Sequence, residues 1–403
     1  MSMEKAMKLA YESAGGKGPG AKLVREAFKK GDFNKTDFSI RRLALETMGN
    51  DWVDKLTPRG SGGVVYAQEQ VDSSMFLNLA NVVLSGAIID EFAQADINAG
   101  DALAETRTVP HIQQGRDIGL TRTDAKSVVV QEGQPFPSFG MGEDWRMYPH
   151  TVKRGAMVEL TKEAIAEDRT GRILENCTGV AEEVVADKNE RILRVVLGID
   201  NSVYLPKGVA AATYTSSAPT GRVNLITGNE LVDWRNVDTA VQAWGDMVHP
   251  ITGRPLNVPL NEISTLVMPA KLATSTYIFN ATEVSVGDVT NTSGAPVMRG
   301  TNPLAYLGRK PGNPQASMLA YYMLTKPAAT GGGAVAAADA KKYWYIGAFR
   351  RAFGYLQNYG LTVLTQTADS EASFRRDVVF ALRASERGVP VVKDPRLVIQ
   401  NRG

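Results

Sequence analysis

The longest stretch of helical patterning in the chain runs from Asp168 to Gly198. Its apolar residues recur at intervals of three and four, which places them along one stripe of a helix. These residues are Ile173, Cys177, Val180, Ala181, Val184, Val185, Ile192, Val195 and Val196. Asp168 or Thr170 is expected to cap the start, and Gly198 fits the left-handed position that ends a helix. We predict a helix of roughly 40 Å, about the diameter of a small domain, although an ordinary long core helix would show the same pattern.

The opposite face of this helix carries charges that alternate in sign. The charged residues are Glu175, Glu182, Glu183, Asp187, Lys188, Glu190, Arg191 and Arg194. Their spacing predicts two ion pairs between residues four apart, from Asp187 to Arg191 and from Glu190 to Arg194.

Residues 1–70 contain three short amphipathic segments, Glu4–Glu12, Ala21–Lys30 and Ser39–Met48, separated by glycine, proline and charged residues. Segments this short are marginal as isolated helices, and we expect them to lack a common core. The sequence therefore predicts an arm that becomes ordered by lying on something else, such as another copy of the chain. Gly60–Gly63 is expected to be a hinge, after which the apolar run Val64–Phe92 rejoins the folded body.

Between Gly100 and Met157 the hydrophobic pattern changes to period two, which is typical of strands. The strand-like segments are 106–109, 118–122, 128–130 and 150–154. Prolines interrupt them, and large apolar residues are too sparse for a separate core. We predict a long protruding β-hairpin whose strand edges need partners outside the hairpin.

A second unit begins near Asn236 with a helical segment. Ile263–Pro269 then reads as a buried strand that leads into the helix Ala270–Phe279, an alternation expected of a compact α/β unit. Gly331–Ala338 is of low complexity and is predicted to be a loop. From Tyr343 onward, alternating apolar residues predict antiparallel strands that return to the body carrying the long helix.

Composition narrows the class of protein. The 403 residues suffice for two or three domains, and 43% of them are hydrophobic, enough to build cores. With 45 basic and 43 acidic residues the net charge is +2, so charge favours neither nucleic acid nor a membrane as the main partner. No apolar run approaches the roughly 18 residues that span a bilayer, and no signal-peptide core is present. We expect a soluble intracellular protein without disulfides, since Cys177 is its single cysteine.

The sequence offers no candidate for catalysis or for binding a cofactor or metal. His111, His150 and His249 are scattered, and with one cysteine they form no usual zinc spacing. The Gly-rich segments lack the Gly-Lys-Ser/Thr ending of a phosphate-binding loop, so we interpret them as hinges. The neighbouring carboxylates Glu182 and Glu183 diverge by about 100° on a helix. We therefore expect no cofactor and no enzymatic activity.

Several local motifs carry a resemblance to a known family. They are Val158–Ile165 with Glu167 and Asp168, the turn Gly253–Leu256 with the strand Leu266–Pro269, and the segments Phe374–Val379, Ala381–Ala384 and Val392–Arg396. Together with the order of arm, hairpin, long helix, inserted α/β unit and returning strands, they make residues 70–403 resemble the major capsid proteins of tailed bacteriophages. These proteins have the Hong Kong 97 fold and include Mu-like head subunits.

The resemblance implies an α+β protein of the Hong Kong 97 type. The implied parts are an N-terminal arm (1–70), the start of the peripheral domain (71–101), an extended β-hairpin loop (102–154), the peripheral domain (155–235) with its spine helix (168–198), an axial domain (236–342) and the peripheral return strands (343–403).

The implied function is that of a major capsid (head) protein. Its copies would assemble into hexamers and pentamers of an icosahedral shell around double-stranded viral DNA, in the cytoplasm of the host bacterium. The implied partners are other copies, portal and decoration proteins, and packaged DNA through non-specific contacts, but no membrane. Because the first 70 residues are interrupted by Ala14–Gly20, a long fused helical scaffold does not fit. We expect an uncleaved subunit whose assembly is guided by a separate scaffolding protein or by none.

Charged and aromatic residues of the hairpin, the strand-to-helix motif and the C-terminal motif are the candidate intersubunit contacts. They are Asp117, Arg122, Lys126, Trp145, Arg154, Glu163, Arg376 and Asp377. Some relatives join subunits through a Lys–Asn isopeptide bond, but no residue-level match transfers this chemistry to Lys126.

Two other functions stay open at this point. Encapsulin nanocompartments share the architecture and enclose cargo enzymes, but the arm and the large insertion after the long helix favour a phage protein. The second alternative is an unrelated α/β enzyme with its site in Asn236–Lys342.

Overall fold

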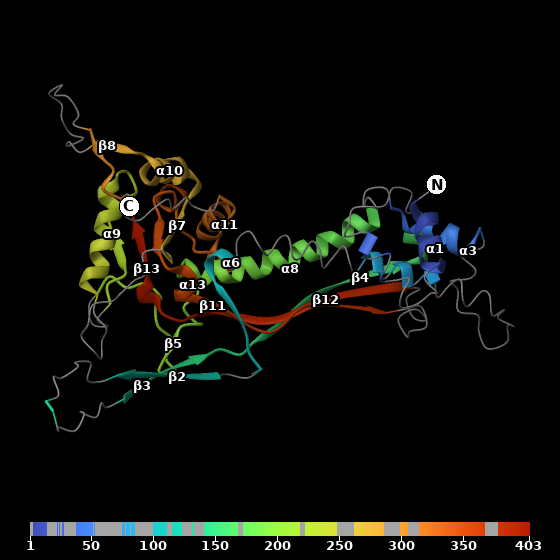
Figure 1. Cartoon of the computed structure of the whole chain (residues 1–403), viewed down its shortest axis with the longest axis horizontal. Coiled ribbons are helices and arrows are strands. Elements are labelled where there is room, and N and C mark those ends of the chain that lie inside the picture. Colours follow the sequence, from blue (N-terminus) through green and yellow to red (C-terminus); the bar gives the residue numbers. More distant parts are fainter. Residues whose placement is uncertain are drawn as a thin grey trace. The chain divides into compact units, whose positions relative to one another are not determined.

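The computed structural model of the chain (Figure 1) describes the following residues. They are 3–13, 22, 24, 26–27, 38–50, 52, 75–76, 78–80, 82–84, 100–110, 115–122, 131–132, 141–167, 172–217, 222–247, 262–285, 299–304, 314–366 and 378–403. The candidate contacts Lys126, Arg376 and Asp377 lie outside these residues.

The chain divides into two compact units, each assembled from separate segments. The first unit comprises Met1–Asp96, Lys153–Asp187 and Tyr359–Arg387, and the second comprises Ile97–Val152, Lys188–Asn358 and Gly388–Gly403. Helices and strands occur in both, so the predicted α+β class is confirmed.

The first unit contains α1 (Met3–Ser13), α3 (Ile40–Met48), α7 (Lys162–Glu167) and most of β4 (Val152–Thr161). The first residue of β4, Val152, belongs to the second unit, and longer parts of both units come from α8 (Arg172–Val196), β11 (Phe353–Gln366) and β12 (Val378–Val392).

The second unit contains the other described elements. Its helices are α6 (Gly100–Leu103), α9 (Trp234–Asp246), α10 (Leu272–Asn280), α11 (Pro314–Thr325), α12 (Ala337–Ala340) and α13 (Phe349–Ala352), with the 3-10 turns η4 (Pro269–Lys271), η6 (Ala328–Thr330) and η7 (Pro395–Leu397). Its strands are β1 (Glu105–Thr108), β2 (Gly115–Arg122), β3 (Met141–Tyr148), β5 (Leu205–Pro206), β6 (Leu225–Thr227), β7 (Ser264–Val267), β8 (Glu283–Ser285), β9 (Arg299–Thr301), β10 (Trp344–Gly347) and β13 (Val398–Arg402). Helix α12 thus begins inside the segment that the sequence predicted to be a loop.

The N-terminal segment shares a hydrophobic core with distant parts of the first unit. Met7 on α1 and Leu43 on α3 are fully buried in this core. The same cluster contains Phe76, Leu79, Leu160, Ile165, Leu382 and Ala384. The expectation of short segments without a common core is therefore wrong for the described residues, because their packing partners lie far away in the sequence.

A buried carboxylate connects α1 with the start of α3. The side chain of Ser39 caps α3 by accepting a hydrogen bond from the backbone N–H of Arg42. The backbone N–H of Ser39 donates in turn to the carboxylate of Glu4 on α1, at 3.2 Å. Glu4 is almost fully buried, so this hydrogen bond satisfies a group that burial would otherwise penalise.

Helix α8 ends where the sequence predicts. Gly198 has a φ of 73° and occupies the left-handed position of a Schellman motif. Its N–H donates to the carbonyl of Val195 at 3.1 Å, and the N–H of Ile199 donates to the carbonyl of Arg194 at 2.9 Å. The described apolar stripe, which includes Val184 and Val195, is buried. Residues 168–171, with the expected cap at the start, lie outside the described part of the chain.

One residue of the predicted charged face is buried instead. Lys188 is only 2% exposed, and its amine lies 5.1 Å from the centre of the Tyr355 ring on β11. This ring covers the side chain and attracts the ammonium group, which a local helical pattern could not reveal. Glu190, predicted to pair with Arg194, forms an ion pair with Lys326 at 3.5 Å.

The sheet at the centre of the second unit has the strand order β6-β13-β10-β7. β10 pairs antiparallel with both β13 and β7, and β13 pairs in parallel with β6. Since successive residues of a strand face opposite sides, Trp344 and Ile346 pack with α9 and α10, whereas Tyr345 packs with α11 and the end of α8. The segment 343–403, assigned from sequence to the peripheral return, thus shares this sheet with β7 of the segment 236–342.

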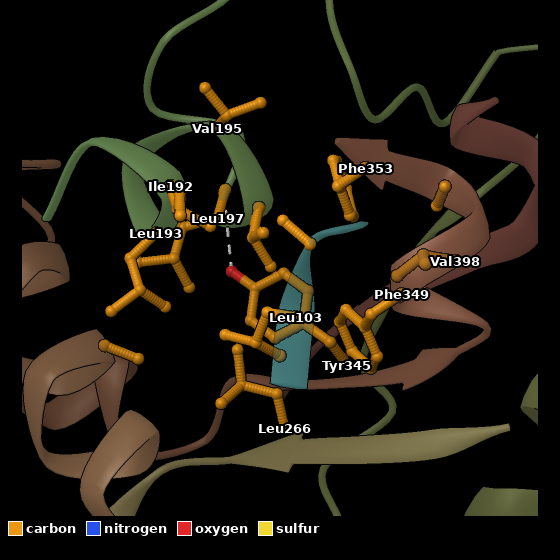
Figure 2. Packing of buried hydrophobic residues seen from close by; sticks show 14 of the residues in the cluster. Leu103, Ile192, Leu193, Val195, Leu197, Leu266, Tyr345, Phe349, Phe353 and Val398 are labelled. Atoms are coloured by element: carbon orange, nitrogen blue, oxygen red, sulfur yellow. Dashed lines mark hydrogen bonds between the residues drawn. The ribbon is translucent and has the colours of Figure 1, made fainter. Parts of the chain in front are cut away.

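Two tyrosine hydroxyl groups reach the buried end of α8. Tyr214 donates to the carbonyl of Val196. Tyr345 donates to the carbonyl of Leu197 at 3.4 Å, and Figure 2 shows this second hydrogen bond. The side-chain amide of Gln400 donates to the Tyr345 hydroxyl at 2.9 Å. Burial raises the pKa of both tyrosines above the ordinary value. Both hydroxyls therefore stay protonated and act as donors at neutral pH.

The other strands form three further sheets, with the orders β1-β11-β12-β4, β2-β3-β5 and β8-β9. The sequence pattern placed residues 106–109 in the hairpin, whereas β1 pairs in parallel with β11, from Glu105 opposite Gly354 to Thr108 opposite Gln357. The partner strand lies about 250 residues further along the chain by these register pairs, so local alternation could not identify it.

Replacing Gly198 with alanine should destabilise the second unit. A Cβ at this position would lie 2.7 Å from the ring of Tyr214, and the backbone would have to hold alanine in the left-handed region. We expect a loss of about 2 kcal/mol or more in the free energy of unfolding, measured by denaturant titration. Gly245→Ala on α9 is the control, since no atom lies within 4 Å of its Cβ position. Equal stability of the two variants would contradict the capping role.

Candidate intersubunit surface

The hairpin of the second unit consists of β2 and β3. Their antiparallel register runs from Gly115 opposite Tyr148 to Arg122 opposite Met141. β5 adds two pairs on the other side of β3, at Arg146 and Met147. Within the described residues, β2 has no neighbouring strand on its outer side. Such an edge presents unpaired N–H and C=O groups that another strand can bind.

The base of the hairpin is anchored by packing and hydrogen bonds. Val109, which follows β1, and Tyr148, the last residue of β3, pack against a small cluster of Leu356, Val389 and Val391. The N–H of Val109 donates to the carbonyl of Gln357 at 2.8 Å, and the side-chain amide of Asn358 donates to the carbonyl of Val109, also at 2.8 Å. The hairpin therefore leaves the unit from a fixed base.

A charged cluster lies at the same base. The carboxylate of Asp394 accepts hydrogen bonds from Nε and Nη2 of Arg396, at 2.8 and 2.7 Å. Burial alone would raise the pKa of Asp394, but the hydrogen bond and charge of Arg396, together with the charge of Arg146 on β3, outweigh burial and lower this pKa. Asp394 thus links the turn after β12 electrostatically to the hairpin.

A second ion pair holds the strand that precedes the hairpin. Glu105 at the start of β1 accepts a hydrogen bond from the amine of Lys393, just after β12. This hydrogen bond and the positive charge of Lys393 lower the pKa of Glu105. Because the Glu105 side chain is largely exposed, we expect this ion pair to contribute little to stability.

Of the candidate contacts that the structure describes, some lie in the first unit and others in the second. Arg154 and Glu163 are exposed in the first unit, and Nη1 of Arg154 lies 3.4 Å from the carboxylate of Asp187. Asp117, Arg122 and Trp145 belong to the hairpin of the second unit, where the register pairs Asp117 with Arg146. The side chains of these three hairpin residues, and that of Cys177, lie outside what the structure describes, as do His111 and His249 entirely.

The residues that fix the hairpin base were not among the candidates. Asp394 and Arg396 lie in the segment Val392–Arg396, one of the motifs behind the family resemblance, so the sequence contained a signal for them. Tyr148 and Asn358 had none, because each acts through a residue remote in the sequence.

Among the described residues, no group of three or more His, Cys, Asp or Glu side chains is arranged to hold a metal ion. His150 is exposed. None of the described helices is both long and apolar enough to cross a membrane.

The comparison with protein families decides the identity. A family model described as phage capsid protein matches residues 148–401, which is more than half of the chain and includes β4, α8 and the central sheet. The chain belongs to the phage capsid protein family. This membership confirms the predicted resemblance to major capsid proteins of tailed phages and the predicted role as a structural protein of the phage capsid.

Solved structures of capsids show likenesses at low sequence identity. The capsid of a native GTA particle is 12% identical, with a TM-score of 0.45, 75% of this chain covered and 89% of that one. The capsid of cyanophage P-SCSP1u is 13% identical, with a TM-score of 0.43, 76% of this chain covered and 88% of that one. A virus-like particle from Pyrococcus furiosus is 10% identical, with a TM-score of 0.37, 79% of this chain covered and 97% of that one. A search of curated proteins gave no match. The predicted Hong Kong 97-type fold is confirmed by the family match together with the long helix and the long strands β11 and β12.

Replacing Asp394 with asparagine in this capsid protein should give a pH-dependent loss of stability. The lowered pKa means that the ionised carboxylate stabilises the folded chain at pH above about 4, and that this contribution disappears as the pH falls through the lowered value. We expect a loss of about 1–3 kcal/mol at pH 7.

Unfolding of both proteins measured from pH 7 down to pH 2 tests this expectation. The wild-type and variant curves should converge in acid. Asp246→Asn, which changes an exposed carboxylate at the end of α9, should unfold with the wild-type midpoint throughout. A wild-type advantage that grows on acidification would refute the assignment.

Proposed function

We propose that copies of this chain form the hexamers and pentamers of an icosahedral shell that encloses double-stranded viral DNA. The observation that supports this most strongly is the match to the phage capsid family over residues 148–401. Assembly takes place in the cytoplasm of the host bacterium. The chain works by association and not by catalysis, since affinity spread over many modest contacts is multiplied by the number of neighbours.

The hairpin is the element best suited to reach a neighbouring copy. Its base is anchored by Tyr148, Val109 and the Asp394 cluster, while the outer edge of β2 has no partner among the described residues. A rigid base with an unpaired edge favours addition of a strand from another copy. We assign the extended loop to residues 102–154, with β2 and β3 as its reaching part and β1 as its attachment to β11.

The remaining parts take the other roles of a shell subunit. We assign residues 155–235 and the returning strands to the peripheral domain, residues 236–342 to the axial domain, and residues 1–70 to an N-terminal segment that packs on the subunit itself. Contacts with packaged DNA are weak and independent of sequence, because a net charge of +2 leaves little basic surface for counterion release. A scaffolding protein, a portal and decoration proteins are the expected further partners.

An encapsulin-like compartment is the alternative function for such a shell. The contents of purified particles distinguish the two functions. Nuclease-protected DNA of uniform length supports the viral shell, whereas a bound enzyme without DNA supports the compartment.

Removing the reaching part of the hairpin should abolish shells without unfolding the subunit. The register places Asp117 opposite Arg146, so residues 118–145 can be replaced by a short Asn-Gly turn while Arg146 and Tyr148 remain. We expect a soluble subunit with the wild-type unfolding midpoint and no particles by negative-stain electron microscopy. Normal particles would show that the hairpin is not an intersubunit arm.

Reversing the charge of Arg154 tests a candidate contact separately from stability. Its ion pair with Asp187 is exposed on both sides, and such pairs contribute only about 0–1 kcal/mol. Arg154→Glu should therefore fold normally, so any loss of particles reports a contact between copies. We expect fewer particles for Arg154→Glu and for Glu163→Lys, measured by sedimentation, at an unchanged unfolding midpoint. Particle yields equal to wild type for both would remove these residues from the interface.

A further inference from the structure

The chain segment that forms α11 and the turns after it contains almost no charged residues. Lys326 is the only charged residue between Pro314 and Ala338, in a chain of which 22% is charged. Its amine is neutralised within the chain, because it lies 3.5 Å from the carboxylate of Glu190 and 5.2 Å from the centre of the Tyr322 ring. The segment therefore presents almost no charge to its surroundings.

Large apolar side chains are exposed on this same surface. Met318 is 64% exposed and Tyr322 is 50% exposed, and their spacing of four residues puts them on one face of α11. The opposite face, with Ala316, Ala320 and Met323, is buried in the core of the second unit. The exposed pair is thus not a part of the chain's own core. Methionine and tyrosine without charges are typical of the centre of protein interfaces.

The segment that follows α11 extends this surface and is held in place. The backbone N–H groups of Gly333 and Val335 donate to the carbonyls of Met323 and Leu324, each at 2.9 Å. The N–H of Ala334 donates to the carbonyl of Lys326 at 3.0 Å. These bonds satisfy the end of the helix and fix a surface of small exposed residues within 327–338. A preformed surface loses little conformational entropy when a partner binds.

A second surface of the same unit matches the first in character. Lys207 is the only charged residue between Asn201 and Gly221. A turn closed by hydrogen bonds from Gly208 to Leu205 and from Ala211 to Tyr204 exposes Val209, which is 69% accessible. The chain therefore carries two different apolar, charge-poor surfaces, as a head-to-tail contact between identical copies requires.

We propose that the α11 surface, formed by Met318, Tyr322 and residues 327–338, binds a second copy of the chain through the turn Lys207–Ala212. DNA and highly charged proteins gain little from a segment whose single charge is already paired within the chain. In a shell built from one chain, an apolar surface is covered by a neighbouring copy. The inference rests on the proposed shell-forming function and names one contact within it.

Charged substitutions at exposed apolar sites test this contact. Met318→Glu, Tyr322→Glu and Val209→Glu should each lower the yield of particles about tenfold or more, because a carboxylate would be buried without a partner. Val232→Glu is the matched control, since Val232 has the same 64% exposure as Met318 but lies among Glu230, Asp233 and Arg235. It should assemble like wild type. All variants should keep the wild-type unfolding midpoint.

Thiol labelling gives a second readout that does not depend on yield. In a Cys177→Ser background, Met318→Cys should react with a maleimide in free subunits and be protected in particles, whereas Val232→Cys should react in both. Wild-type yield for Met318→Glu or Val209→Glu, or full labelling of the Met318→Cys variant in particles, would overturn the proposed contact. If wild-type chains form no particles at all under the same conditions, the proposed function itself fails.

Discussion

The second unit depends on how the end of α8 is satisfied inside a hydrophobic core. The last carbonyl groups of a helix have no partner within the helix, and water cannot reach them here. The Schellman motif at Gly198 provides two backbone donors, and the hydroxyls of Tyr214 and Tyr345 provide two more. Tyr345 also belongs to β10, so its hydrogen bond to the carbonyl of Leu197 holds the end of α8 against the central sheet (Figure 2). The registers of β13 and β7 then determine which side chains face each layer.

The hairpin is stabilised by different interactions from those in this core. Its base is fixed by three kinds of side-chain interaction: apolar packing of Tyr148, a hydrogen bond from Asn358 and the charged Asp394–Arg396 pair. Further out, strand pairing between β2 and β3 is the main described interaction. A two-stranded ribbon gains little stability alone, which is consistent with an element that becomes fully stabilised only by contact with another copy.

Local patterns in the sequence were sufficient to predict elements whose packing partners are near in the chain, or whose periodic pattern continues over many residues. The end of α8 at Gly198 and its buried stripe were predictable from spacing alone. The burial of Lys188 was not, because the covering ring of Tyr355 comes from β11. The parallel pairing of β1 with β11 and the core around Met7 and Leu43 were not predicted for the same reason, because their partners lie far away in the sequence. Among the site residues, the positions of Asp117, Arg122 and Trp145 on the hairpin could be predicted. Asp394 and Arg396 lie in a motif that the sequence revealed, but their role as anchors was not predicted, and Tyr148 and Asn358 had no local signal.

The segmented core of the first unit has a consequence for biosynthesis. Met7 and Leu43 are buried in one cluster with Leu382 and Ala384, so this core cannot close until almost the whole chain has left the ribosome. Until then its apolar surface is exposed, and contacts between such distant segments form slowly. A protein needed in many copies per particle would therefore place a heavy demand on the chaperones of its host during synthesis.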